Sequence, residues 1–411
     1  MLKNKLNIII LSTFLIKLVF VFFFHEKNLT DEWSILFENF KKFNSYSYYV
    51  FDGKPIPSSY MPPLYFLFLY FHKIISFDLI NFVYLVIFNQ VLISSISIYY
   101  FYKICRHFFE ERTSLIGSLI FSLFPLMIFS TGLISSATLQ LFLYLLFFKL
   151  YLDLFTNKFT VRNLFSLIVV CALNLVLRGE FIIILLFSMI YLILINRKKA
   201  ISGILILLCT LILITPYVHR NYNNTGKLHL VNSSGYALWK GNNQLADVEG
   251  FHNSLHPNSR SSWPEYFEFE NLYQNLDKIE KNEMYETNRD KVFKDEAFKN
   301  ISSNKIKYFK LYLKKIFSFY FLDLDSSIKN YYNPFHILPV ILVGILSIPG
   351  IIIAFKKFNN SKITYLILIT CTLTLFISIF FILPRYKISI VSFQILFSLF
   401  CFNYLIQLKK K

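Results

Sequence analysis

Apolar runs long enough to cross a lipid bilayer recur along the chain, and they constrain its fold more than any other feature. The first run, residues 6–24, would extend about 28 Å as a helix, close to the roughly 30 Å of a hydrocarbon core. Hydrophobic residues make up 55% of the sequence, enough to supply many such runs. We expect spanning helices at residues 6–24, 79–102, 113–130, 136–152, 163–177, 181–195, 201–217, 335–355, 363–383 and 388–407. The chain is therefore predicted to be an all-α, polytopic integral membrane protein with about ten transmembrane helices.

The first apolar run is predicted to remain attached as an anchor. His25, Glu26 and Lys27 follow it, where a cleavable signal peptide would have small residues. The five cysteines lie in or beside apolar runs, so the sequence supports neither a disulfide framework nor a Cys-type zinc site.

Positive charge gathers in the short segments between apolar runs. The formal net charge is +18, but lysines that flank spanning helices follow the positive-inside pattern of membrane proteins. We therefore expect membrane lipids as partners and no nucleic acid.

Residues 62–76 are the ambiguous apolar stretch, because as a helix they reach only about 22 Å. If this stretch does not cross, six basic segments share one side of the membrane: 1–5, 103–112, 153–162, 196–199, 356–362 and 408–411. These segments hold 16 Lys and Arg residues but only three acids, as expected of the cytoplasmic side. We therefore predict that 62–76 is an interfacial helix opened by Pro62 and Pro63. The chain is then a multi-pass protein of the plasma (inner) membrane, with both termini cytoplasmic.

The opposite, outer side receives the remaining segments: 25–78, the turn at 178–180, 218–334 and 384–387. Together they hold 21 of the 24 acids. This division predicts three parts: an N-terminal membrane module at 1–217 that includes the first outer loop (25–78), an outer-face segment at 218–334, and C-terminal membrane helices at 335–411.

The outer-face segment ends in a basic amphipathic stretch that is typical of a helix lying on a lipid surface. Helical spacing places four apolar residues on one face: Ile306, Phe309, Leu313 and Ile316. Four lysines supply its positive charge: Lys307, Lys310, Lys314 and Lys315.

Asp31 and Glu32 form an acidic pair at the start of the first outer loop. The apolar residues that follow recur with helical spacing, which predicts a helix over 31–43 with Thr30 as its N-cap. The helix dipole favours ionised carboxylates in a first turn. The pair is therefore either part of a functional site or an ordinary feature of a helix N-terminus, where acidic residues are common.

Isolated arginines stand where other apolar runs end, at Arg178, Arg220 and Arg385. A guanidinium binds phosphate with two parallel hydrogen bonds, so these residues are candidate phosphate ligands. The alternatives are interfacial anchoring and, for Arg178, a structural pair with Glu180. The sequence contains no G-x-x-x-x-G-K-[ST], H-E-x-x-H or G-x-S-x-G motif, and its histidines are scattered. This argues against a P-loop ATPase, a zinc protease of that type or an α/β-hydrolase.

Several passages in order resemble the GT-C membrane glycosyltransferases that use polyprenyl-phosphate sugar donors. The likeness is to the protein O-mannosyltransferase and lipid A aminoarabinose transferase branch, glycosyltransferase family 39-like. Asp31-Glu32 follows the first helix, as the Asp-Glu or Asp-Asp motif of that family does. Residues 61–65 (Met-Pro-Pro-Leu-Tyr) match its Pro-Pro-Leu-Tyr segment, and residues 177–180 (Leu-Arg-Gly-Glu) resemble its Arg-Pro-Glu turn.

The most specific likeness lies after the seventh expected helix. Residues 215–222 (Thr-Pro-Tyr-Val-His-Arg-Asn-Tyr) and 235–243 (Gly-Tyr-Ala-Leu-Trp-Lys-Gly-Asn-Asn) resemble the bacterial Thr-Pro-Trp…Arg-Asn-Tyr and Gly-Tyr…Trp…Gly-Asn-Asn pattern. Residues 385–387 (Arg-Tyr-Lys) resemble its Arg-Tyr-Arg/Lys motif. Two departures stand out. The loop at 135–138 lacks the second acid that family members often carry, and serines replace the prolines that usually follow the Arg-Tyr motif.

The resemblance implies an inverting glycosyl transfer at the outer interface from a polyprenyl-phosphate-linked donor. Asp31 would be the general base that takes the proton of the acceptor hydroxyl; Glu32 would orient a cation or act as the base itself. No cofactor is required by this scheme; a divalent metal stays open, and the missing second acid argues against one. The acceptor would be a lipid, a glycan or a protein. The candidate substrate-binding residues are Lys54, Tyr65, Arg178, Glu180, Arg220, Asn242, Arg385 and Tyr386.

Three alternatives stay open at this level. A transporter or flippase for a lipid-linked glycan would also need arginines that face phosphate. A glycan polymerase or ligase would use lipid-diphosphate donors instead of monophosphates. An inactive relative that acts as an assembly subunit would explain the missing second acid.

Overall fold

The computed structural model describes residues 2–77, 79–156, 160–195, 199–250, 269–326, 333–358 and 360–409. Within these ranges, the side chains of residues 2–4, 31 and 409 lie outside the description.

Every apolar run predicted to span is helical. The helices are α1 (Leu2–Phe24), α4 (Phe82–Cys105), α5 (Glu111–Leu123), α6 (Pro125–Phe129), α7 (Ala137–Asp153), α8 (Val161–Leu177), α9 (Phe181–Ile195), α10 (Ala200–Thr225), α15 (Pro334–Phe358), α16 (Ser361–Ile377) and α17 (Ile388–Lys409). Among the described residues, five helices are long and apolar enough to cross a membrane, namely α1, α4, α10, α15 and α17. A sixth candidate is the bent pair of α5 with α6, and α8, α9 and α16 are shorter apolar helices. The total of about ten spans therefore stays a prediction.

Prolines explain where the observed helices differ from the expected ones. The helix expected over 113–130 breaks between Phe124 and Pro125 with a bend of 57°. The residue before a proline is disfavoured in the helical region, and Phe124 is extended, with ψ 129°. The short helix η1 (Ser130–Gly132) then leads towards α7.

Helix α10 continues beyond the expected end at residue 217. It passes through Pro216 and stops at Thr225, where Gly226 adopts the left-handed conformation of a helix C-cap. Arg220 therefore lies inside the last turns of a helix and not just outside one. At the other end of the chain, α16 stops at Ile377, six residues before the expected boundary at 383.

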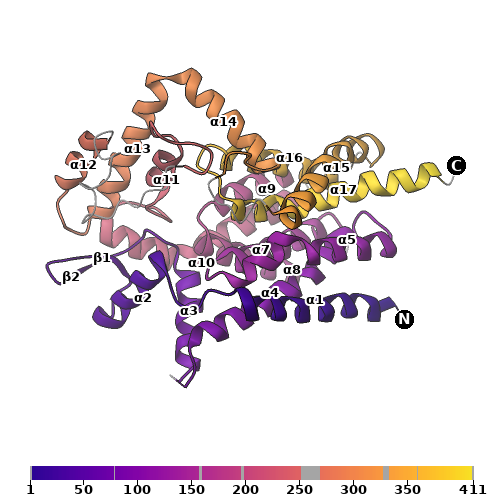
Figure 1. The fold of residues 1–411 in the computed structure, drawn as a ribbon, viewed down its shortest axis with the longest axis horizontal. Helices are drawn as coiled ribbons and strands as arrows, with labels where there is room; N and C mark the ends of the chain where they lie inside the picture. The colour runs from indigo at the N-terminus through magenta and orange to yellow at the C-terminus, as the bar shows by residue number, and fades with distance from the viewer. Residues whose placement is uncertain are drawn as a thin grey trace.

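Most elements of the predicted outer-side segments lie at one end of the molecule, and the helix α14 runs from that end back towards α16 (Figure 1). The first outer loop contains α2 (Asp31–Phe43), β1 (Ser47–Phe51), β2 (Lys54–Pro57) and α3 (Pro63–Ile75). The outer-face segment contains α11 (Ser234–Gly241), α12 (Glu270–Asp277), α13 (Tyr285–Ser303) and α14 (Lys305–Tyr320). Both predicted interfacial helices, 31–43 and 62–76, are thus confirmed as helices.

The two strands form an antiparallel hairpin that pairs Phe51 with Lys54. Its two turn residues, Asp52 and Gly53, both have positive φ, at 49° and 74°. Positive φ at both central positions is the requirement of a type I′ hairpin turn, which Asp-Gly satisfies at low cost.

Both termini lie at the end opposite most of these outer-side elements (Figure 1). There, His107 contacts Asp153 at 3.2 Å and Lys362 at 3.2 Å, and Lys149 contacts the same Asp153 at 2.8 Å. These contacts join three of the six basic segments, 103–112, 153–162 and 356–362. The prediction that they share one side of the molecule is consistent with this geometry.

Three hydrophobic clusters hold the described elements together, and the smallest packs α11 against α12 and α13 around Trp239 and Phe293. The largest lies among α7, α9, α16 and α17, where Tyr151 packs against Tyr365 and Phe148 against Phe393. Helix α15 packs closely on α17, because a side chain at Gly350 would clash with the carbonyl oxygen of Phe397. The remaining cluster lies beneath α2 and α3 and joins them to α1 and α4.

Candidate functional site

The acidic pair lies in the first turn of α2, as predicted. Thr30 has the extended backbone of an N-cap, although its side chain makes no capping hydrogen bond. The side chain of Asp31 lies outside the described atoms, and that of Glu32 is half-buried. Trp33 fixes this turn, because its ring packs edge-on against the buried Tyr65 with 4.8 Å between ring centroids.

Glu32 faces helix α11. Burial lowers the pKa of the Lys240 ammonium; the charge of Glu32 opposes this shift, and the charge of Arg385 adds to it. The carboxylate and the two cations therefore lie within electrostatic reach of one another. The positive charges of Lys240 and Arg385 repel each other, and an anion bound between them would relieve this repulsion. Lys240 also stands 4.6 Å from the centre of the Phe381 ring.

Asp290 of α13 sets the position of α11. Its carboxylate accepts hydrogen bonds from the backbone N–H groups of Gly235 and Tyr236, each at 3.0 Å, and so satisfies the N-terminus of the helix. A side chain at Gly235 would clash with the carbonyl oxygen of Asp290, so the close approach of the two helices requires glycine there. Tyr236 and Lys240, four residues apart, consequently share one face of α11.

The Arg-Tyr motif lies on the short helix η6 (Pro384–Lys387) and joins this group to the α8–α9 turn. The guanidinium of Arg178 lies 5.8 Å from the ring centre of Tyr386. Arg178 also forms an ion pair with Glu180, with Nη2 and Nε at 3.0 and 3.1 Å from the same carboxylate oxygen. Arg385 is exposed, and its guanidinium lies 6.0 Å from the Tyr386 ring.

Carboxylates from elsewhere in the chain flank the loop that lacks the second acid. Glu26 accepts a hydrogen bond from the backbone N–H of Ile134 at 2.6 Å. At the first turn of α7, Gln140 donates to Glu180 at 3.2 Å. Within the part of the chain that the structure describes, no group of three or more His, Cys, Asp and Glu side chains is arranged to hold a metal ion.

Two of the predicted substrate-binding residues support the first outer loop. Arg220 donates to the carbonyl oxygen of Ser58 at 2.8 Å, and its guanidinium lies 5.8 Å from the Tyr46 ring. Tyr65 is fully buried and donates to Gln90 at 2.9 Å.

The predicted substrate-binding residues Lys54 and Asn242 have contrasting environments. Lys54 is exposed at the tip of the hairpin. Asn242 is buried and donates to the carbonyl oxygens of Leu238 and Ile379, at 2.8 and 2.9 Å. The hydrogen bond to Ile379 joins the end of α11 to the segment that leads into η6.

Asn242 also contacts Lys315, the one lysine of the amphipathic stretch that is buried and not at the surface. Lys315 was expected on the charged surface of that stretch, but it is fully buried and donates to Gly241 O at 2.6 Å and Asn242 Oδ1 at 3.2 Å. Burial lowers its pKa to about 7. The apolar face is completed by Phe317 rather than by the half-buried Ile316.

The structure adds four residues to the predicted site residues: Lys240, Tyr236, Tyr60 and Arg289. The pKa values of Tyr60 and Tyr236 are raised chiefly by burial; the charge of Glu32 raises them further, and that of Arg289 lowers them. The four-residue spacing of Tyr236 and Lys240 within the motif at 235–243 indicates that both lie on one face of a helix, and this spacing was visible in the sequence. Nothing in the sequence around Arg289 distinguishes it from other surface cations of a helix.

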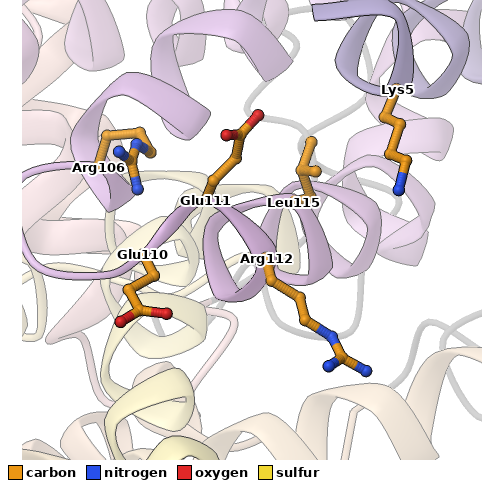
Figure 2. A pocket seen from close by; sticks show the side chains of 6 residues that line it. All are labelled: Lys5, Arg106, Glu110, Glu111, Arg112 and Leu115. Atoms are coloured by element: carbon orange, nitrogen blue, oxygen red, sulfur yellow. The ribbon is translucent and has the colours of Figure 1, made fainter. Parts of the chain in front are cut away.

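A cavity of about 480 Å³ lies far from this group, at the end that holds the termini. Lys5 of α1 faces the start of α5 across it, and Arg106, Glu110, Glu111 and Arg112 line its opposite side (Figure 2). It brings together charged residues from segments 1–5 and 103–112 and contains none of the residues discussed above.

The sequence matches no protein-family model and no curated protein. Its fold, however, is similar to that of an archaeal oligosaccharyltransferase, AglB of Archaeoglobus fulgidus, solved with an inhibitory peptide and a dolichol-phosphate. That match has a TM-score of 0.52 and 12% identity, and it covers 97% of this chain and 50% of that one. The apo form of the Archaeoglobus fulgidus oligosaccharyltransferase gives a TM-score of 0.54 at 11% identity, covering 98% and 50%. The chain thus spans about half the length of these neighbours. It is an all-α membrane protein with the GT-C fold.

Proposed function

We propose that the chain is a membrane glycosyltransferase. It moves a sugar from a polyprenyl-phosphate-linked donor to an acceptor hydroxyl at the end of the molecule that holds α2 and α11. The GT-C fold supports this class of reaction. The observation that carries the assignment is the chain of ring contacts that links two cations. Lys240 stands over the Phe381 ring, Phe381 packs against Tyr386, and the guanidinium of Arg385 lies 6.0 Å from the Tyr386 ring centre. The charge of Glu32, in the acidic first turn of α2, also acts on Lys240.

In this reaction the acceptor oxygen forms a bond to the anomeric carbon while the bond from that carbon to the phosphate oxygen breaks, with inversion. The electron pair stays on the lipid phosphate, which gains negative charge. Asp31 takes the acceptor proton, a contribution typically worth about 10² to 10⁴-fold in rate. Lys240 and Arg385 stabilise the departing phosphate, because preorganised charges act most strongly where charge develops. Glu32 holds Lys240 in place.

The other predicted arginines have neighbours that favour positioning roles. Arg178 pairs with Glu180 and faces Tyr386, so it orients the motif that carries Arg385. Arg220 holds the carbonyl oxygen of Ser58 and thereby the loop before α3.

The proposed reaction takes place on the outer, extracytoplasmic side of the plasma membrane. The acidic segments group at the end opposite both termini (Figure 1), which fits cytoplasmic termini under the positive-inside rule. The lipid tail of the donor would remain in the bilayer beside the apolar helices.

The decisive experiment incubates purified protein in lipid vesicles with a panel of polyprenyl-phosphate sugars and measures released polyprenyl phosphate. Mass spectrometry of the lipid product, monophosphate or diphosphate, separates this reaction from that of a polymerase or ligase. Asp31→Asn should lower transfer about 10² to 10⁴-fold with normal membrane insertion. Transfer at the wild-type rate by Asp31→Asn would refute its role as the base.

A further inference from the structure

A cluster of tyrosines on the outer side surrounds a single arginine. The guanidinium of Arg289, on α13, lies 4.8 Å from the ring centre of Phe293, 5.3 Å from that of Tyr236 and 5.7 Å from that of Tyr49. The hairpin supplies Tyr49, the loop after it supplies Tyr60, and α11 supplies Tyr236. The first outer loop and α11, which are distant in sequence from each other, therefore both contribute tyrosines to the surroundings of one cation on α13.

The acids next to Arg289 in the sequence are committed to other partners. Glu286 accepts hydrogen bonds from Ser58 and Ser59, and Asp290 accepts those of the α11 backbone. The charge of Glu286 interacts with Arg289 only at longer range. The cation is therefore held by aromatic faces rather than by a direct ion pair.

The polar atoms of this cluster are left without partners. Among the described residues, neither the guanidinium of Arg289 nor the hydroxyls of Tyr49, Tyr60 and Tyr236 make a hydrogen bond. Tyr60 is 8% exposed, and Arg289, Tyr49 and Tyr236 are half-buried. Their polar atoms are not sealed from solvent, so a ligand can reach them. A guanidinium offers five donors and no acceptor, so the missing partner is rich in acceptor oxygens.

The cluster adjoins the proposed reaction site. The charges of both Arg289 and Glu32 act on Tyr60 and Tyr236, and they shift the pKa values of these tyrosines in opposite directions. Tyr236 also precedes Lys240 by one helical turn on α11. A molecule held at Arg289 would therefore reach towards the acidic turn.

We propose that Arg289 and the hydroxyls of Tyr49, Tyr60 and Tyr236 bind an oxyanion, carboxylate or phosphate, carried by the acceptor. The guanidinium provides a planar fork that matches either oxyanion, and the aromatic faces cover the apolar side of the bound group. The identification of this ligand as the acceptor rests on the proposed glycosyltransferase function; the oxyanion site itself does not.

The test measures binding without any donor. Full-length protein in nanodiscs is titrated calorimetrically with three probes: glucuronate, glucose 6-phosphate and methyl glucoside. The charged sugars separate a carboxylate site from a phosphate site, and methyl glucoside reports neutral sugar binding. The double variant Lys240→Gln, Arg385→Gln serves as the background, so that the proposed donor-phosphate pair does not contribute.

One or both charged sugars should bind at least about tenfold more tightly than methyl glucoside, the effect of one charge-assisted hydrogen bond. Arg289→Gln should abolish this preference, and Arg289→Lys should restore part of it. Lys281→Gln is the matched control, because Lys281 stands 5.4 Å from the Phe51 ring on the same surface without belonging to the cluster. It should keep the full preference.

Equal binding of all three probes would overturn the proposal, as would a preference that survives in Arg289→Gln. If Arg289→Gln does not fold, the double variant Tyr60→Phe, Tyr236→Phe decides, because it keeps the ring packing and removes only hydroxyls. An unchanged preference in that variant refutes the site. A preference for charged sugars in a protein that transfers no sugar would leave the oxyanion site standing and refute the proposed function.

Discussion

The carboxylate of Glu286 accepts a hydrogen bond from the hydroxyl of Ser58 at 2.6 Å, although 228 residues separate them in the sequence. Its second oxygen accepts the backbone N–H of Ser59 at 2.8 Å. Glu286 is almost fully buried. This one side chain therefore joins the first outer loop, which carries Tyr60, to the helix that carries Arg289.

Replacing Glu286 should destabilise the contact between the first outer loop and α13. Glu286→Gln replaces one of two hydrogen-bond acceptor oxygens with an NH₂ group at a buried position, and we expect it to lower the free energy of unfolding by about 1–3 kcal/mol. Thermal unfolding of the protein in detergent measures the loss. Glu283→Gln, at an exposed position in the turn just before α13, is the matched control and should change stability little.

The contribution of Glu286 to the free energy of unfolding should also depend on pH. Burial raises the pKa of Glu286 above its ordinary 4.5, and the hydrogen bonds from Ser58 and Ser59 oppose the shift only in part. The folded state then binds a proton more readily than the unfolded state, so this group stabilises most below pH 4.5. Its contribution is lost as the pH rises through the raised pKa. The stability difference between wild type and Glu286→Gln should therefore shrink as pH rises, and a difference that grows would contradict this assignment.

Lys240 should govern donor binding. Lys240→Gln removes one charged contact to the proposed phosphate, and we expect the KM for the lipid donor to rise about 10- to 100-fold. Lys278→Gln, an exposed lysine on the outer side, is the control. An unchanged KM in Lys240→Gln would remove this residue from the phosphate site.

The pH profile of donor binding gives an independent test of Lys240. Burial and the charge of Arg385 lower its pKa, so its ammonium loses a proton at a lower pH than an exposed lysine does. Because only the charged form attracts phosphate, KM should rise with pH before other lysines titrate. Lys240→Arg keeps its charge over this range and should flatten the profile; identical profiles for this variant and wild type would argue against the assignment.

Arg178 and Tyr386 should be energetically coupled. At 5.8 Å from the ring centre, and with a side chain that is 26% exposed, the guanidinium should contribute about 0.5–1 kcal/mol through this contact. A double-mutant cycle with Arg178→Gln and Tyr386→Leu, read from thermal unfolding, isolates that energy from the pairing of Arg178 with Glu180. Strict additivity of the two substitutions would show that the arginine does not orient the motif.

Periodicity predicted the helices of this fold well, because it reports burial along one chain segment. Helix α2 begins and ends where the spacing of its apolar residues indicated, at residues 31 and 43. Pro125 and Pro216 show the limit of this approach: the first bends its segment, whereas the second is accommodated within α10. Local sequence does not reveal which tertiary contacts will tolerate a proline.

The candidate site was predictable only where its residues belong to motifs. Asp31, Glu32 and Arg385 belong to such motifs, and the charges of Glu32 and Arg385 both act on Lys240. Arg289 was not selected, because its role depends on three aromatic residues from other segments. In a sequence with 19% aromatic residues, no spacing distinguishes such a cluster from ordinary core packing.

Helix α14 should lie in the outer lipid surface. Ile306, Phe309, Leu313 and Phe317 form an exposed apolar face, while Tyr308 and Leu311 pack against the protein. An exposed face of this kind beside basic residues is typical of a helix at the membrane interface. Tryptophan introduced as Phe309→Trp should therefore be quenched by brominated lipids in reconstituted vesicles.

The control for that experiment is Phe298→Trp. Phe298 on α13 is exposed to a similar degree, 54% against 61% for Phe309, but α13 has a polar sequence with no comparable apolar face. We expect its tryptophan to be insensitive to brominated lipids and quenched by aqueous iodide instead. Equal lipid quenching of both tryptophans, measured against the constant signal of the native ones, would place α13 at the same depth. Lipid quenching of neither would place α14 in water, and the amphipathic face would then need another partner.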